Sequence, residues 1–234
     1  MTMIAQNLQA VHARLSAACI AARRPVDAVL LLAVSKTCGV SAIKEAFAAG
    51  QTRFGENYIQ EAVDKIAALR HLPLQWHCIG PVQGNKTRLV AEHFDWVHSV
   101  DRLKIAQRLS AQRPAHLAPL QVCIQVNTDG GANKAGVAPQ DLAALAHAVA
   151  RLPKLTLRGL MTIPEPAPDF LAAQALHARA RALMDDLNAS GLALDTLSMG
   201  MSADLEAAVH AGSTMVRVGT AIFGARPVAG SRVS

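Results

Sequence analysis

An unbroken apolar run, Val-Leu-Leu-Leu-Ala-Val, occupies residues 29–34 of this chain and limits the folds open to it. A strand with one buried face alternates apolar and polar residues, whereas a continuous run predicts a strand buried on both faces. Such strands are typical of parallel sheets covered by helices. Because Ser35, Lys36 and Thr37 follow directly, the sequence predicts a lysine at the carboxyl end of a buried parallel strand.

The same unit, a short apolar strand, a polar or glycine-bearing junction and a helix, recurs along the chain. An amphipathic helix with Ile4, Leu8, Val11, Leu15 and Cys19 on one face precedes the first unit. Alternating strands and helices predict parallel pairing with right-handed crossovers. Eight units in 234 residues favour an α/β fold closed into a (β/α)8 barrel. We expect its strands near residues 29–34, 52–55, 75–79, 96–100, 120–126, 157–162, 195–199 and 215–218.

No linker interrupts this pattern, so we expect residues 1–234 to form a single domain. The longest irregular stretch, residues 163–168, is too short to separate two domains. An open doubly wound sheet is the alternative architecture. The glycine motif typical of that architecture, Gly-x-Gly-x-x-Gly after the first strand, is absent, because Lys36-Thr37-Cys38-Gly39 occupies this junction.

Composition limits the kinds of partner and compartment. The net charge of +6 is spread along the chain and aromatic residues make up only 3%, which argues against a nucleic-acid-binding platform. Neither a signal peptide nor a charge-free apolar stretch of membrane-spanning length is evident. The four cysteines are far apart, without metal-ligand spacing, so we expect reduced core residues, no metal site and a cytoplasmic protein.

In such a barrel, the residues just beyond each strand share one rim, where active sites lie. Two of these junctions suit an anion. The loop from Ser198 to Ser202 runs into an expected helix at residues 203–209, and Arg217 is followed by Gly219 and Thr220. Hydroxyls and backbone N–H groups at the start of a helix bind phosphate well.

Lys36 would face this anion site across the barrel mouth. An amine shielded by apolar walls loses hydration, which favours the neutral form that can attack an aldehyde. An amine that forms imines, a phosphate site and a neighbouring cation together suit pyridoxal 5′-phosphate. Arg217 beside the ring nitrogen would disfavour ring protonation, so carbanion chemistry of the transaminase type becomes unfavourable.

Several motifs carry a resemblance to a known family. They are Ala-Val-Ser-Lys-Thr at 33–37, Phe-Gly-Glu-Asn-Tyr-Ile-Gln-Glu at 54–61, Trp-His-Cys-Ile-Gly-Pro-Val-Gln at 76–83, Leu-Ser-Met-Gly-Met-Ser at 197–202 and Arg-Val-Gly-Thr-Ala-Ile-Phe-Gly-Ala-Arg at 217–226. In this order they resemble the YggS/PROSC family of pyridoxal phosphate homeostasis proteins. The resemblance extends from about the first helix to the carboxyl end.

The resemblance implies a single-domain barrel like the amino-terminal domain of alanine racemase, with pyridoxal 5′-phosphate as an internal aldimine on Lys36. It places Asn57 and His77 near the cofactor and Arg217 near the ring nitrogen. It assigns the phosphate to Ser198, Gly219 and Thr220. One departure is Gly131, which stands where the family usually has a glutamate in the loop at 127–136.

The resemblance further implies a role in holding vitamin B6 cofactor and supplying it to apo-enzymes that depend on it. The alternative is a pyridoxal-phosphate enzyme with racemase-like activity. Efficient racemisation needs a second base on the opposite face of the substrate, and the only tyrosine, Tyr58, is expected in the helix after the second strand. We therefore expect no catalytic residues and no efficient turnover, in a monomer or weak homodimer.

Overall fold

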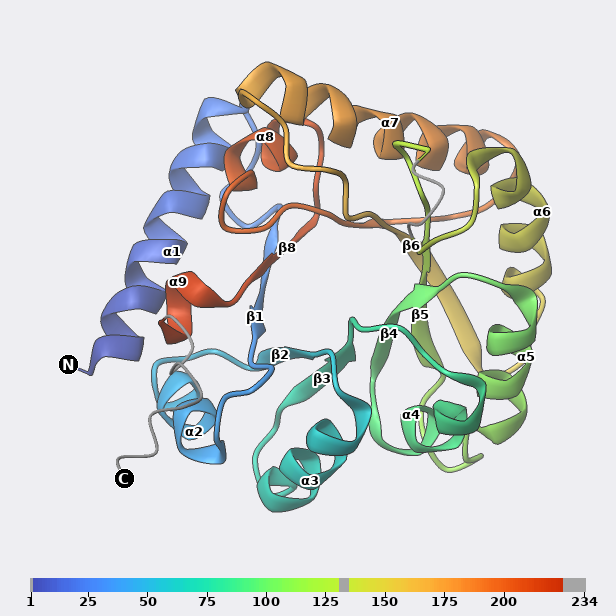
Figure 1. The fold of residues 1–234 in the computed structure, drawn as a ribbon, viewed down its shortest axis with the longest axis horizontal. Helices are drawn as coiled ribbons and strands as arrows, with labels where there is room; N and C mark the ends of the chain where they lie inside the picture. Colours follow the sequence, from blue (N-terminus) through green and yellow to red (C-terminus); the bar gives the residue numbers. More distant parts are fainter. Residues whose placement is uncertain (1, 131–134, 225–234) are drawn as a thin grey trace, which may run out of the picture.

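Eight parallel strands form a closed barrel in sequence order in this computed structural model, which describes residues 2–130 and 135–224 (Figure 1). Strand β8 pairs with β1, so Arg217 lies opposite Leu32 and the sheet closes. The closed barrel confirms the predicted fold and excludes the open doubly wound sheet. The strands are β1 Leu30–Val34, β2 Arg53–Glu56, β3 Gln75–Cys78, β4 Trp96–Val100, β5 Leu120–Gln125, β6 Leu155–Met161, β7 Thr196–Ser198 and β8 Met215–Val218.

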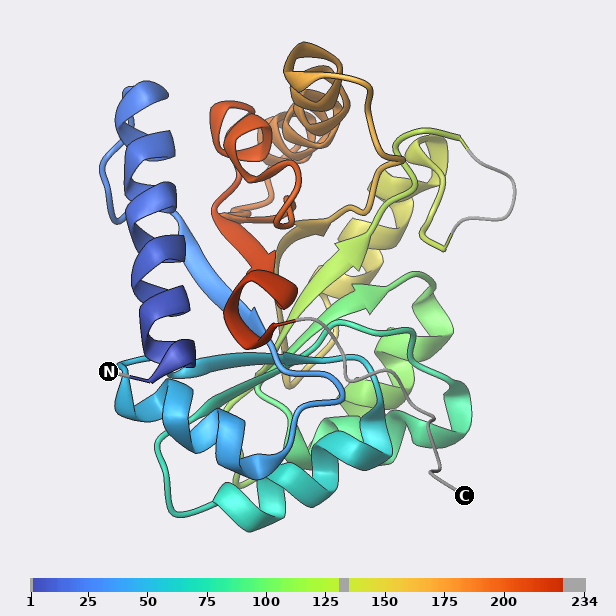
Figure 2. The same ribbon diagram turned by 60° about the vertical axis from the view of Figure 1, so that its left-hand side comes forward.

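Helices surround the barrel, as Figures 1 and 2 show. Each strand is followed by at least one helix before the next strand begins, which is the connection that parallel neighbours require. The helices are α1 Met3–Ala21, α2 Val40–Ala48, α3 Ile59–Leu69, α4 Thr87–His93 with a preceding 3-10 turn at Gly84–Lys86, α5 Leu103–Gln112, α6 Pro139–Ala150, α7 Phe170–Ala189, α8 Leu205–His210 and α9 Thr220–Phe223.

All eight strands lie within two residues of their predicted bounds, because their apolar runs are flanked by polar junctions. Two local predictions were wrong. Helix α8 begins at Leu205, two residues after the expected start, because residues 202–204 form a turn. Tyr58 does not lie within α3 but immediately precedes it, with extended backbone and a side chain that is 52% exposed.

The amino-terminal helix α1 packs beside α8 and α9, next to the point where the barrel closes (Figure 2). Its apolar face is the predicted one and includes Leu8 and Leu15, both buried. Asn7 donates a hydrogen bond to the carbonyl of Ile222 at 2.9 Å, so α1 also fixes the last described helix. The predicted extra helix is therefore an integral part of the barrel wall.

The main apolar core lies between the strands and the helices that cover them. Two smaller clusters are separate from it, Leu32 with Ile79 and Met215, and Trp96 with Cys123 and Met161. Members of the second cluster come from β4, β5 and β6, and side chains alternate between the two faces of a strand, so these clusters belong to the barrel interior. The interior is a packed core that also holds polar groups.

The described residues contain no helix that is both long and apolar enough to cross a membrane.

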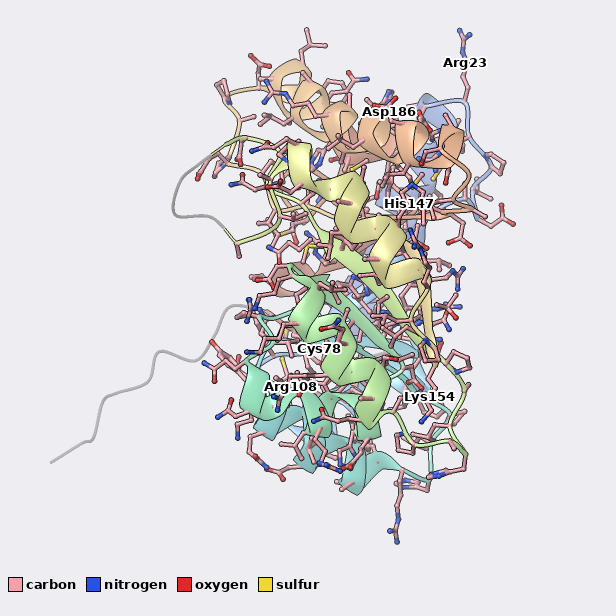
Figure 3. All side chains as sticks on the ribbon, turned by 90° about the vertical axis from the view of Figure 1, so that its right-hand side faces the viewer. Arg23, Cys78, Arg108, His147, Lys154 and Asp186 are labelled. Atoms are coloured by element: carbon pink, nitrogen blue, oxygen red, sulfur yellow. The ribbon has the colours of Figure 1, made fainter. Side chains whose placement is uncertain are left out.

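The four cysteines are free, and three of them are buried, as the prediction of reduced core residues requires. The basic side chains Arg23, Arg108 and Lys154 are exposed at separate parts of the surface (Figure 3).

Candidate functional site

A cavity of about 340 Å³ lies at the carboxyl ends of β1, β2 and β8. Its volume is within the range of small-molecule sites. Five of the seven predicted site residues line it: Lys36, Asn57, Arg217, Gly219 and Thr220. The rest of the lining is Val34, Ile79, Ile163, Met201, Ser202 and Ala203. The structure thus brings together an amine, a guanidinium, an amide and two loop segments against a partly apolar wall.

Lys36 follows β1 by two residues and is half-buried. It also lines a second cavity of about 260 Å³, which shares Val34, Gly219 and Thr220 with the first. Within residues 2–130 and 135–224, its amine makes neither a hydrogen bond nor an ion pair. A lysine amine that is positioned in a cavity and has no protein partner is available for a ligand.

The two loops predicted to bind an anion meet in the cavity through Ser202, Gly219 and Thr220. Their backbone N–H groups donate to no acceptor in the described part of the chain, and the hydroxyls of Ser202 and Thr220 likewise have no partner there. A Cβ atom at Gly219 would lie 3.1 Å from the Val34 carbonyl oxygen, so glycine allows β8 and β1 to approach closely. Converging N–H and O–H donors suit a phosphate.

Asn57 follows β2 directly, and its Oδ1 atom is buried without a hydrogen-bond partner in the described residues. Its backbone is held against Gly80, where a Cβ atom would lie 2.3 Å from the Asn57 carbonyl oxygen. An orphaned acceptor in a cavity wall is costly unless a ligand or water pairs with it. Asn57 therefore presents an acceptor to whatever fills the cavity.

Arg217 is the buried cation of the site, only 5% exposed. It donates to the Ser198 carbonyl at 2.5 Å, to Ser198 Oγ at 2.9 Å and to the Thr162 carbonyl at 2.8 Å. Burial lowers the pKa of its guanidinium to about 10, so the group stays charged at neutral pH. Because these acceptors are all uncharged, the positive charge remains available to a ligand.

Behind Arg217, a chain of polar side chains crosses the barrel interior. Ser198 Oγ lies 2.8 Å from His98 Nδ1, His98 Nε2 lies 2.9 Å from His77 Nδ1, and His77 Nε2 lies 3.1 Å from Gln75 Oε1. Strands β4 and β7 are not neighbours, so this contact must pass through the interior. Burial lowers the pKa of His98 to about 3 and that of His77 well below its usual range. Both imidazoles are therefore neutral.

The hydrogen-bond partners fix one consistent set of proton positions for this chain. Gln75 Oε1 is an acceptor, so His77 carries its proton on Nε2 and accepts at Nδ1. His98 then donates from Nε2 and accepts at Nδ1 from the Ser198 hydroxyl, whose oxygen accepts from Arg217. Every member is satisfied, and the chain orients the guanidinium from behind.

His77 and Ser198 do not line the cavity, although we expected Ser198 at the rim and the resemblance placed His77 near the cofactor. His77 is the third residue of β3, stacked on Trp96 with ring centroids 5.3 Å apart, and is fully buried. Ser198 points to His98 and Arg217. Both side chains face inward, one layer below the mouth. Ser202, four residues after Ser198, takes the cavity position.

Sequence reasoning missed His98. The sequence feature that could have indicated it is its place as a polar residue inside the apolar run of β4, two residues after Trp96 and on the same face of the strand. Its pairing with Ser198 joins residues 100 positions apart on strands that do not touch, which no local pattern predicts. The loop departure at Gly131 lies outside the described residues, as does the end of the last motif at residues 225 and 226.

The two buried histidines give a testable pH dependence. Their folded pKa values lie below the unfolded value of about 6.5, so stability is present above pH 6.5 and is lost as the pH falls towards 3. We expect the free energy of unfolding to fall by about 1 kcal/mol per pH unit for each histidine between pH 6 and 5. Urea unfolding at a series of pH values measures this free energy. The His98→Asn variant should show a shallower slope, and an identical slope would contradict this assignment.

Residues 6–227 match the family model described as alanine racemase, N-terminal domain. The pyridoxal phosphate homeostasis protein of Pseudomonas aeruginosa is 62% identical over 97% of both chains. The chain belongs to the pyridoxal phosphate homeostasis protein family. The homeostasis protein of Escherichia coli, 52% identical over 97% of this chain and 98% of its own, agrees. The resemblance to the YggS/PROSC family is thereby confirmed.

Solved structures of this family share the barrel. PipY of Synechococcus elongatus, determined with pyridoxal phosphate bound, superposes with a TM-score of 0.83 at 41% identity, covering 94% of this chain and all of PipY. Alanine racemase of Corynebacterium glutamicum superposes with a TM-score of 0.69 at 19% identity and covers 98% of this chain and 63% of its own. The second match shows a common fold only. The predicted barrel of the alanine racemase type is thus confirmed.

Proposed function

We propose that this chain binds pyridoxal 5′-phosphate in the 340 Å³ cavity through a covalent bond to Lys36, and serves to hold and supply this cofactor. The observation that carries the proposal is a lysine amine without a partner among the described residues, in the same cavity as a buried cation and a set of N–H groups that are likewise unpaired there. PipY, which its structure shows with pyridoxal phosphate, and the homeostasis proteins named above support it. We place this role in the cytoplasm, where the four free cysteines would stay reduced.

The cavity fits each part of the cofactor. Ser202, Gly219 and Thr220 would hold the phosphate, Asn57 would pair through its orphaned oxygen, and Arg217 would face the ring nitrogen. When bound, the cofactor supplies an aldehyde carbon that an amine can attack. The nitrogen of Lys36 forms a double bond to that carbon, and the aldehyde oxygen leaves as water. Ser198 and His77 would act behind Arg217, through the chain described above.

The arrangement favours holding the cofactor over turning over a substrate. A cation at the ring nitrogen disfavours protonation there, which weakens the ring as an electron sink. The only tyrosine, Tyr58, is half-exposed and does not line the cavity, so no tyrosine stands opposite Lys36 as a second base. The racemase alternative has no observation that favours it. Cofactor-loaded protein mixed with an apo-enzyme that depends on pyridoxal 5′-phosphate should restore the activity of that enzyme. The loaded protein should not convert any of a panel of amino acids rapidly.

Separate variants test which serine holds the phosphate. Ser202→Ala removes a hydroxyl from the cavity, so we expect about tenfold weaker binding of pyridoxal 5′-phosphate but unchanged binding of pyridoxal, which has no phosphate. Ser198→Ala acts through Arg217 and should weaken both compounds to a similar extent. Titration followed by absorbance gives the four affinities. If only Ser198→Ala weakens binding of pyridoxal 5′-phosphate without weakening binding of pyridoxal, then Ser198 and not Ser202 binds the phosphate.

A further inference from the structure

Lys36 lies in a turn whose backbone is strained. The next residue, Thr37, has a φ of +65°, in the left-handed region that β-branched residues strongly disfavour. Strained backbone of this kind persists only where contacts from outside the turn hold it, and it gathers at functional sites. The contacts that hold this turn therefore also determine where the Lys36 side chain begins.

Helix α3 supplies the first of these contacts. Glu61, in its first turn, accepts a hydrogen bond from the Thr37 backbone N–H at 2.8 Å through Oε1. The same oxygen accepts from Lys65 Nζ at 2.5 Å, one helical turn further on. The strained residue is thus tied to an ion pair that is oriented within a helix.

The second contact holds the residue before Lys36. The buried Lys65 ammonium donates to the Ser35 carbonyl at 2.9 Å and to Glu56 Oε1 at 2.8 Å, in addition to Glu61. The Ser35 hydroxyl donates to the same Glu56 oxygen at 2.7 Å. All three N–H donors of Lys65 are therefore used. Lys65 holds the residue before Lys36, and its partner Glu61 holds the residue after it.

We propose that Glu56, Glu61 and Lys65 form a clamp that fixes residues 35 and 37 and so holds the Lys36 amine toward the cavity for bond formation; this rests on the proposed function. A buried ion network adds little stability over an apolar cluster, because the loss of hydration offsets the attraction between the charges. An apolar cluster could not bind one backbone carbonyl and one backbone N–H. Glu56 is also followed directly by Asn57, so the clamp joins two parts of the cavity wall.

Two substitutions at Glu61 separate positioning from general stability. Glu61→Ala removes the acceptor for Thr37, whereas Glu61→Gln keeps an oxygen that can accept both existing hydrogen bonds. Glu61 is partly exposed, so both variants should fold. Asp185→Ala, which breaks the exposed pair with Arg181 on α7, is the matched control.

The experiment uses the full chain freed of cofactor. Stopped-flow absorbance gives the rate of covalent bond formation with pyridoxal 5′-phosphate, and calorimetry gives the affinity for pyridoxine 5′-phosphate, which has no aldehyde. Glu61→Ala should slow bond formation at least about tenfold while the affinity for pyridoxine 5′-phosphate changes less than about twofold. Glu61→Gln should recover most of the rate, and Asp185→Ala should match the parent protein.

An unchanged rate in Glu61→Ala overturns the clamp. So does a parallel fall in the rate, in the affinity for pyridoxine 5′-phosphate and in thermal stability, because that pattern is a general loss of structure. A parent protein that binds pyridoxine 5′-phosphate but forms no covalent bond contradicts the proposed function itself, and the clamp with it.

Discussion

Lys36→Ala is expected to abolish the covalent link to pyridoxal 5′-phosphate and to leave weak reversible binding. The variant lacks the only amine among the described residues that line the 340 Å³ cavity, yet it keeps Arg217 and the unpaired N–H groups of both loops. We expect the affinity to fall at least about tenfold, or about 1.4 kcal/mol. Absorbance of the imine band and intact mass after borohydride reduction measure the two effects.

Lys44→Ala is the matched control, because Lys44 is exposed on α2 and does not line the cavity. It should bind and react like the parent protein. A Lys36→Ala protein that still gives a reduced adduct of the same yield at a different lysine would contradict the assignment. Loss of the link with no change in affinity would show that the imine contributes nothing to retention.

Gly80→Ala is the second substitution for which we expect a large effect. A Cβ atom there would lie 2.3 Å from the carbonyl oxygen and 2.8 Å from the Cα of Asn57, so backbone must move. Overpacking of this kind costs typically about 1–3 kcal/mol, and the expected shift displaces Asn57 from the cavity wall. We therefore expect lower stability together with weaker cofactor binding, measured by urea unfolding and by titration.

Gly84→Ala is its control in the same connection between β3 and α4. Nothing lies within 4 Å of a Cβ atom at Gly84, so this variant should keep the parent's affinity and most of its stability. If Gly80→Ala binds the cofactor as tightly as Gly84→Ala, the contact between residues 80 and 57 does not shape the site.

The barrel could be predicted because the sequence of each strand is a short apolar run and polar junctions separate these runs. The repeat determines the number and direction of the strands, and topology then brings the residues after each strand to one rim. For this reason one cavity is lined by five of the predicted site residues, Lys36, Asn57, Arg217, Gly219 and Thr220. Their predicted contacts with the cofactor remain proposals.

The direction of individual side chains was harder to predict. Adjacent residues of a strand face opposite sides. The location of a side chain near a strand end, at the rim or in the barrel interior, therefore depends on its exact position in the strand. His77 is the third of the four residues of β3, and its side chain faces the barrel interior and not the rim. The clamp around Lys36 joins Ser35, Glu56 and Lys65, whose pairing depends on how α3 packs beside β1 and β2. No spacing within the sequence shows that packing.

A covalent bond between Lys36 and the cofactor is tested by borohydride reduction of the cofactor-loaded protein, followed by intact mass and mapping of the modified peptide. We expect one added reduced pyridoxal phosphate per chain, on the peptide that contains Lys36. A reduced adduct confined to another lysine, such as the buried Lys65, or no covalent adduct in a protein that binds the cofactor, would contradict it.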